Sequence, residues 1–155
     1  MGYTTEFSGE FVLNTELDAT TYALLVKLQE TRRMARRLPN EYGIEGEFFV
    51  DGTGLCGQDR SSDIIDYNRP PSTQPSLWCD WIPTDDRKSI VWNGSEKFYS
   101  YTEWIKYIIA NILAPKGYVL NGTMIWQGED IGDAGRIIIT DNVVKTQVAT
   151  FKDVE

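Results

Sequence analysis

Polar and apolar residues alternate over the first predicted strand, residues 5–13. Phe7, Phe11 and Leu13 share one face at a spacing of two, and the residues between them are largely polar. This pattern is typical of a strand that buries one face and exposes the other. We therefore predict a strand on one side of an apolar core.

The spacing of apolar residues then changes to three and four, from Ala19 to about Arg37. This spacing predicts an amphipathic helix, which Asp18 is placed to cap and Pro39 to end. We expect a short strand after it, over residues 47–50. The apolar positions of the predicted helix are Leu24, Leu25, Leu28, Ala35 and Leu38.

A long polar stretch, Gly52–Pro75, separates these elements from the second half of the chain. It is rich in glycine and proline, and we expect at most a helical turn or two in it, near Ser61–Tyr67. Connections of this length are uncommon within compact domains and are often functional. The segments Leu77–Ile82 and Ser89–Trp92 then predict a hairpin.

The second predicted helix carries the clearest local signals. Ser100 and Glu103 match the S-x-x-E capping box, and Tyr99 and Trp104 are spaced as a hydrophobic staple. Pro115 marks its end. Its apolar face comprises Tyr101, Trp104, Ile105, Ile108 and Ile112.

Two turn signals follow this helix. Asn121-Gly122 predicts a hairpin within residues 118–127, because this dipeptide favours the tight turn that joins antiparallel strands. Asp141-Asn142 predicts a second hairpin, which joins Arg136–Thr140 to Val143–Ala149. Together the elements predict a single α+β domain over residues 1–155, with a mostly antiparallel sheet of roughly six to eight strands and two helices on one face.

The two halves of the chain also align with each other at an offset of 76 residues. Pro39 then matches Pro115, and several glycine positions that follow agree as well. The alignment suggests two repeat units, 1–76 and 77–155, each with the order strand–helix–strand–strand. Chance alignment of a few prolines and glycines explains the match equally well, so both interpretations stay open.

The amino-acid composition excludes several kinds of catalytic and metal site. The chain contains no histidine, which removes the commonest general base near neutral pH and the commonest metal ligand. Its two cysteines, Cys56 and Cys79, are too few for a four-cysteine zinc or iron–sulfur site. We therefore expect no metal, no cofactor and no histidine-based catalysis.

Charge and hydropathy bear on location and partners. No apolar signal segment precedes the first strand, so we expect a cytoplasmic protein with two free thiols. The longest apolar run is far shorter than the roughly 20 residues of a membrane span, so no membrane association is expected. A net charge of −8 opposes direct binding to nucleic acid. An acidic surface suits a basic partner patch, although solubility explains the charge better.

Two further motifs have ordinary structural explanations. Arg32, Arg33, Arg36 and Arg37 could bind phosphate or an acidic partner, but we favour solvated cations that complement the dipole at the end of the first helix. Gly52–Gly57 matches the G-x-G-x-x-G pattern of dinucleotide-binding loops. No predicted helix of sufficient length follows this motif to receive a pyrophosphate, so a tight excursion of the chain is the better interpretation.

The best candidate site lies in the long polar stretch and the strand after it. An extended loop is where a scaffold acquires a site, and exposed tryptophans beside it would provide an anchoring surface. Side chains alternate along the predicted strand, so we expect at least one of its two tryptophans to face away from the core. The candidate binding residues are Asp59, Arg60, Asp63, Asp66, Arg69, Trp78 and Trp81.

Several short motifs in the second half of the chain, taken together, resemble those of a known group of proteins. They are Leu77-Trp78-Cys79-Asp80-Trp81, Glu96-Lys97-Phe98-Tyr99, Tyr101-Thr102-Glu103-Trp104, Leu113-Ala114-Pro115-Lys116-Gly117-Tyr118, Leu120-Asn121-Gly122 and Trp126-Gln127-Gly128-Glu129-Asp130. As a set, over roughly residues 58–142, the sequence resembles a group of uncharacterised small proteins from bacterial genomes and prophages. The resemblance implies a mobile-element setting and an accessory or host-interaction role. It assigns no activity and no functional residue.

We therefore expect a non-catalytic binding protein that acts through residues 53–76 and the neighbouring aromatic side chains. A phage- or prophage-type inhibitor or modulator of a host protein fits this expectation. Two alternatives stay open: a module that binds a small anionic ligand such as a nucleotide, and an enzyme that uses Asp59, Asp63 or Asp66 as acid or base. Neither the identity of a partner nor the oligomeric state follows from the sequence.

Overall fold

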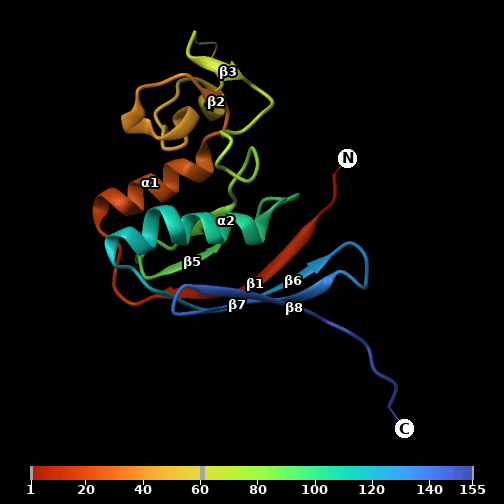
Figure 1. Ribbon diagram of the computed structural model, residues 1–155. Helices are drawn as coiled ribbons and strands as arrows, with labels where there is room; N and C mark the ends of the chain where they lie inside the picture. The colour runs from red at the N-terminus through yellow and green to blue at the C-terminus, as the bar shows by residue number, and fades with distance from the viewer. Residues whose placement is uncertain (1, 60–61, 155) are drawn as a thin grey trace.

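A six-stranded antiparallel sheet with two helices on one face forms the larger part of the molecule (Figure 1). The computed structural model describes residues 2–59 and 62–154. The predicted α+β class, with a mostly antiparallel sheet and two helices, is confirmed. In sheet order the strands are β4 (Trp81–Pro83), β5 (Ser89–Trp92), β1 (Thr5–Leu13), β6 (Leu120–Gly128), β7 (Ala134–Thr140) and β8 (Val143–Val148).

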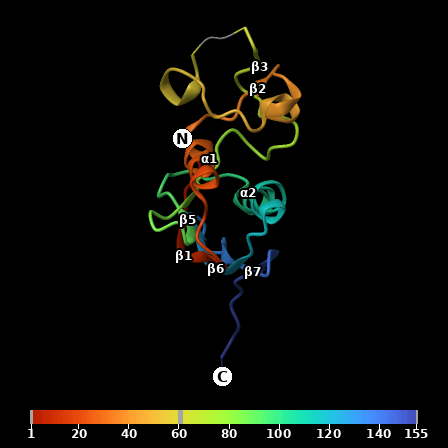
Figure 2. The ribbon, with the colours of Figure 1, turned by 90° about the vertical axis from the view of Figure 1, so that its left-hand side faces the viewer.

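The elements are stacked in three layers (Figure 1, Figure 2). The helices α1 (Ala19–Glu30) and α2 (Tyr101–Ile108) lie between the sheet and a smaller part that we call the cap layer, the described residues within 31–76. None of the helices in the described ranges has both the length and the apolar character that crossing a membrane requires. The cap layer contains a two-stranded sheet, β2 (Ala35–Arg36) with β3 (Ile64–Asp66), and 3-10 turns at Asn40–Tyr42, Ile44–Gly46 and Leu55–Gly57.

The hydrophobic core lies between the sheet and the helices. Phe7 and Phe11 of β1 contact Trp81 of β4 edge to face, with ring centroids 5.3 and 5.6 Å apart. Trp81 is 1% exposed, and its indole N–H donates to the carbonyl of Tyr101 at 2.9 Å. Large aromatic rings with satisfied polar atoms therefore join the sheet to the start of α2.

Helix α1 begins where the sequence predicts and ends earlier. The carboxylate of Asp18 accepts from the backbone N–H of Thr21 at 2.7 Å, and this bond lowers the pKa of Asp18 to about 2. The prediction of a helix as far as Arg37 is wrong, because the chain becomes extended after Glu30. Its backbone then bonds to segments distant in the sequence, with the N–H of Arg33 donating to the carbonyl of Leu77 at 2.8 Å. Tertiary hydrogen bonds have outweighed local helix propensity here.

Helix α2 begins at the predicted residue without the predicted capping box. Ser100 has a left-handed backbone (φ 58°), and its side chain makes no capping hydrogen bond. A capping side chain acts from an extended backbone, so the box cannot form. The helix continues through a π turn, Ile109–Leu113, and a 3-10 turn, Ala114–Lys116. The buried side chains of the predicted apolar face are Trp104, Ile105, Ile108 and Ile112.

Of the two predicted C-terminal hairpins, one is confirmed and one is wrong. Asp141 and Asn142 both have positive φ (46° and 69°) in the tight turn between β7 and β8, as a two-residue hairpin requires. Asn121-Gly122 instead lies within β6, which pairs with β1 along its whole length. A Cβ at Gly122 would lie 2.5 Å from the carbonyl oxygen of Glu10, so this glycine allows close strand approach and not a turn.

Several predictions for the first half are corrected by the cap layer. Residues 47–50 are irregular and form no strand, and the segment expected to contain a helical turn, 61–67, contains β3. The G-x-G-x-x-G motif forms a tight 3-10 turn, as predicted, and no helix follows it among the described residues. Residues 44–52, which the offset of 76 residues aligns with β6, lie outside the main sheet. The internal similarity therefore stays a prediction from the sequence.

Candidate functional site

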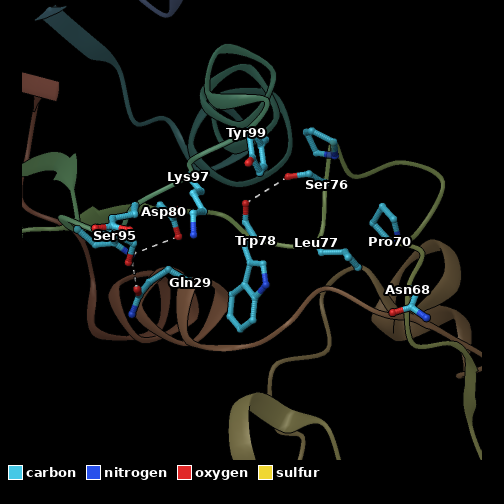
Figure 3. A pocket seen from close by; sticks show the side chains of 13 residues that line it. Gln29, Asn68, Pro70, Ser76, Leu77, Trp78, Asp80, Ser95, Lys97 and Tyr99 are labelled. Atoms are coloured by element: carbon cyan, nitrogen blue, oxygen red, sulfur yellow. Dashed lines mark hydrogen bonds between the residues drawn. The ribbon is translucent and has the colours of Figure 1, made fainter. Parts of the chain in front are cut away.

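A cavity of about 730 Å³ lies where the cap layer meets the helices and the β4–β5 hairpin. We call it the Trp78 pocket. One wall is Gln29 of α1, and a second is formed by the chain that descends from the cap layer into β4. The third is the loop from β5 to α2. The lining residues are Gln29, Asn68, Pro70, Pro75, Ser76, Leu77, Trp78, Asp80, Asn93, Ser95, Glu96, Lys97 and Tyr99, most of which are labelled in Figure 3.

The chain that enters β4 lines the pocket, and β4 is shorter than the sequence predicts. A strand was expected from Leu77, but pairing with β5 begins only at Trp81. The four residues before it are irregular, and Asp80 is 6% exposed although its side chain is a carboxylate. The irregular backbone thus places a charged group at the inner end of a cavity.

Asp80 is poorly partnered for a buried carboxylate. Its Oδ1 accepts one long hydrogen bond, 3.5 Å from the Nδ2 of Asn93, and its Oδ2 has no hydrogen-bond donor in the described part of the chain. Burial raises the pKa of Asp80 to about 6, and the bond from Asn93 opposes this shift only weakly. An acceptor in this state is available to a ligand.

Two amides fix the walls beside Asp80. The Nδ2 of Asn93 also donates to the Oε1 of Gln29 at 2.9 Å, and the Oδ1 of Asn93 accepts from the backbone N–H of Ser95 at 2.9 Å. The backbone N–H of Asn93 donates to the carbonyl of Asp80 at 3.0 Å. These bonds tie α1, the start of β4 and the loop after β5 to one another, so the inner end of the pocket is preorganised.

Trp78 and Tyr99 give the pocket its aromatic surface. In the view of Figure 3, Asp80 and Gln29 lie on one side of the Trp78 indole and Pro70 on the other. Trp78 is half-buried, whereas Tyr99 is 51% exposed and its hydroxyl accepts from the backbone N–H of Tyr3 at 3.0 Å. The ring surface of Trp78 is therefore open to the cavity.

The indole N–H of Trp78 also lacks a partner among the residues described. Each of the other indole N–H groups donates a hydrogen bond within the protein, to Tyr101, Ser95, Ser76 or Asp133. Buried indoles usually find such a partner. Trp78 is thus the tryptophan whose polar atom is left for something outside the fold.

The structure does not bring the predicted binding residues together. Of those it describes, Trp78 alone lines the Trp78 pocket. Trp81 is part of the core, and Asp59 and Asp66 are exposed on the cap layer. Arg60 lies outside the described residues.

The remaining two predicted residues take part in ion pairs of the cap layer. Asp63 approaches Arg36, with 3.7 Å between a carboxylate oxygen and a guanidinium nitrogen. Arg69 binds Glu45 through both of its terminal nitrogens, the shorter contact being 2.8 Å. The bond from Arg69 contributes most to a pKa of about 2 for Glu45. Arg69 is therefore occupied on the cap layer and does not line the pocket.

The prediction of solvated arginines is wrong for Arg33 and Arg36. They are only 2% and 4% exposed. Arg33 donates to the Oε1 of Gln74 at 3.2 Å and to the carbonyl of Glu47 at 2.7 Å, and burial lowers its pKa to about 10. The Glu47 carboxylate in turn accepts from the hydroxyl of Tyr107 in α2 at 2.7 Å. A polar network centred on Arg33 therefore attaches the cap layer to α2.

Metal and thiol chemistry find little support. Within the described ranges no group of three His, Cys, Asp or Glu side chains is placed to hold a metal ion. Cys56 and Cys79 are free, as predicted, and burial raises the pKa of the Cys79 thiol to about 12. Cys79 is therefore an inert part of the core.

Sequence reasoning did not assign Gln29, Asp80, Asn93 or Lys97 to a site, although all four line the pocket. One signal could have found Asp80: it lies between Cys79 and Trp81, two apolar residues that are fully buried. A carboxylate in such a position is buried with them or breaks the strand. Both occur here, since the strand begins only after it.

Comparison of the chain with protein-family models, curated proteins and solved structures finds no match.

Proposed function

We propose that this protein is a non-catalytic binding protein that holds a small organic molecule in the Trp78 pocket. One observation carries the proposal: an acceptor on Asp80 and a donor on Trp78, both without partners among the described residues, line one cavity of about 730 Å³. Small-ligand pockets commonly measure roughly 300–1,000 Å³ and combine apolar walls with a few polar groups. A ligand that bonds to both atoms would exchange their contacts with solvent for two hydrogen bonds inside the pocket.

The position of the pocket supports the same function. Asn68, Pro70 and Pro75 belong to the long polar stretch that the sequence marked as additional to the scaffold, and they form part of one wall. Arg33 and Arg36 hold the stretch through hydrogen bonds to Gln74 and to the carbonyl of Gly57, and a recess lies beneath it. Its predicted binding role is thus retained, with a small molecule as the partner.

A fragment screen by saturation-transfer difference NMR tests the proposal. Neutral, cationic and anionic single-ring compounds are offered to the wild-type protein and to Trp78→Ala. We expect at least one class of compound to bind the wild type and not the variant, because the substitution removes both the ring surface and the free indole N–H. Phe151→Ala, which removes an aromatic ring that is 84% exposed on the C-terminal segment, is the control. Binding that survives Trp78→Ala, or no binding at all, would contradict the proposal.

A second candidate function is contact with a protein partner through the tip of the cap layer. Leu55 is 82% exposed and Ile65 is 42% exposed, and both lie in the 53–76 stretch that the sequence favoured. Exposed apolar side chains of this kind mark interaction surfaces when they cluster. A partner captured by the wild type and by Trp78→Ala, but not by Leu55→Asp, would favour this function over the first.

A further inference from the structure

The charges around the Trp78 pocket restrict what it can bind. Its charged lining residues are Asp80, Glu96 and Lys97, so carboxylates outnumber cations. The described ion pairs of the protein lie elsewhere, and none includes Asp80. Arg69, one of the candidate binding residues named from the sequence, is bound to Glu45. An anion entering this pocket would meet a carboxylate at its inner end.

The two amides beside Asp80, those of Gln29 and Asn93, already donate hydrogen bonds within the protein. The Nδ2 group of Asn93 is directed at Gln29 and Asp80, and the Nε2 of Gln29 donates to the carbonyl of Val26 at 3.2 Å. The Oδ1 of Asn93 is occupied by the N–H of Ser95. At the inner end, the open polar position is therefore an acceptor, the Oδ2 of Asp80.

Resting on the function proposed above, we propose that the ligand presents an amidine-type edge, two adjacent N–H donors, to the carboxylate of Asp80 and a flat ring to Trp78. A carboxylate accepts two parallel N–H bonds from such an edge, and charge assistance makes these bonds short and strong. The indole face favours a flat, electron-poor or cationic ring. This edge is found both in amidinium and guanidinium cations and in neutral amino-heterocycles such as guanine.

Isothermal calorimetry with matched probes tests the ligand class. Benzamidine and benzoate share a ring and differ in the sign of charge, and guanosine carries the edge that adenosine lacks. We expect benzamidine to bind at least tenfold more tightly than benzoate, and guanosine to bind more tightly than adenosine. Asp80→Asn should weaken benzamidine binding about 10- to 100-fold, in line with hydrogen bonds to charged groups. Asp85→Asn, which alters an exposed carboxylate that does not line the pocket, should leave it unchanged.

The pH dependence of the wild type provides a test that needs no variant at Asp80. Benzamidine affinity should fall as the pH is lowered from 8 to 5, because a protonated Asp80 loses an acceptor and its charge. The other charged or titratable side chains of the lining are Glu96, Lys97 and Tyr99. Glu96→Gln separates the contribution of the second carboxylate, and we expect the pH dependence to persist in it.

The results of these experiments separate failure of the proposed ligand class from failure of the proposed binding function. Benzoate or adenosine binding as tightly as its partner, or no loss in a folded Asp80→Asn, would overturn the ligand class. If that binding still requires Trp78, the proposed function stands. If neither these probes nor the fragment screen yields a compound that binds the wild type, both proposals fall.

Discussion

The sheet with its two helices and the cap layer differ in what fills their interiors. Between the sheet and the helices lie apolar side chains such as Phe11, Trp104 and Leu120, all fully buried. The interior of the cap layer holds the guanidinium groups of Arg33 and Arg36, hydrogen bonded mainly to backbone carbonyls. The first region is held by non-directional burial of area and the second by directional bonds. The Trp78 pocket lies at their junction, where neither kind of interior continues.

Because their interiors differ, the two regions should respond differently to substitutions. Apolar packing is shared by many residues, so loss of one contact in the core is felt by the whole sheet. In the cap layer a few charged side chains carry the structure, and one Nη atom of Arg33 already lacks a partner among the described residues. We therefore expect core substitutions to unfold the molecule globally and cap substitutions to open the cap layer locally.

The largest effect is expected from Phe11→Ala in β1. Phe11 is fully buried, and removal of a buried phenylalanine side chain typically costs about 3–5 kcal/mol. Urea unfolding followed by circular dichroism should show a lower midpoint with an unchanged slope. Val12→Ala, at a neighbouring residue that is 45% exposed, should change stability by less than about 0.5 kcal/mol. Equal effects of the two substitutions would contradict the placement of the core.

Arg33→Ala is expected to have the next largest effect, confined to the cap layer. It leaves the carbonyl of Glu47 and the Oε1 of Gln74 with fewer donors, at a cost of about 2–3 kcal/mol. Hydrogen exchange should show lost protection over residues 31–76, while amides of β1 and β6 keep theirs. Arg37→Ala changes an exposed neighbour and should leave exchange unaltered. Uniform loss of protection in both layers would show that the two regions do not differ as described.

The sequence predicted the first region far better than the second. Period-two alternation identified β1 to the residue, and the apolar positions of α2 are buried as expected. In the cap layer the hydrophobic pattern gave a wrong prediction, because the spacing of the arginines is also typical of a solvated helix end. Nothing local distinguishes Arg33 from Arg37, although one is buried and the other exposed. The partners of Arg33 lie 14 and 41 residues away, and only the folded chain brings them together.

The pocket was predictable only in part, for the same reason. The sequence marked the long polar stretch and Trp78, and both contribute to it. It also marked Trp81, which pairs with Trp92 inside the sheet, and Arg69, which binds Glu45. Gln29 and Asn93, which join the walls, are 64 residues apart, and no sequence pattern relates one to the other.

Asp80→Asn should affect ligand binding and stability in opposite directions, since the carboxylate that would bind a ligand also destabilises the fold at high pH. Burial raises the pKa of Asp80 from 3.8 to about 6, so the native state holds this proton more tightly than the unfolded state. The contribution of Asp80 to stability is therefore most favourable below about pH 4 and is lost as the pH rises through 6. Replacing the carboxylate removes that loss, and we expect the variant to be about 1–2 kcal/mol more stable than the wild type at pH 8, with allowance for screening.

The measurement is a pair of thermal unfolding curves at pH 8 and pH 5. The gain from Asp80→Asn should shrink at pH 5, where the wild-type carboxyl is largely protonated. Asp85→Asn is the control and should show no difference between the two pH values. A variant that is less stable than the wild type at pH 8 would mean that Asp80 has a stabilising partner in the native state.

Glu45→Gln is expected to have the smallest effect, because its carboxylate lies at the edge of the cap layer. Arg69 and the N–H of Ser72 keep the pKa of Glu45 at about 2, below its usual value of 4.5. The carboxylate therefore stabilises the fold above about pH 4.5, and this contribution is lost as the pH falls through 2. The melting temperature should drop slightly at pH 7, and this difference should fade as the pH approaches 2. A drop as large as that of Arg33→Ala would contradict the ranking.

The binding of a small molecule between the two regions is tested most directly by the indole N–H resonances in a ¹H–¹⁵N spectrum. The signal of Trp78, assigned with Trp78→Phe, is followed while the fragments are added. We predict that a binding fragment shifts this resonance in a saturable way. The resonances of Trp81 and Trp126, core residues whose indole N–H groups donate to Tyr101 and Asp133 outside the pocket lining, should stay nearly unmoved. Fragments that leave the Trp78 resonance unmoved, or that shift the core indoles instead, would contradict the claim.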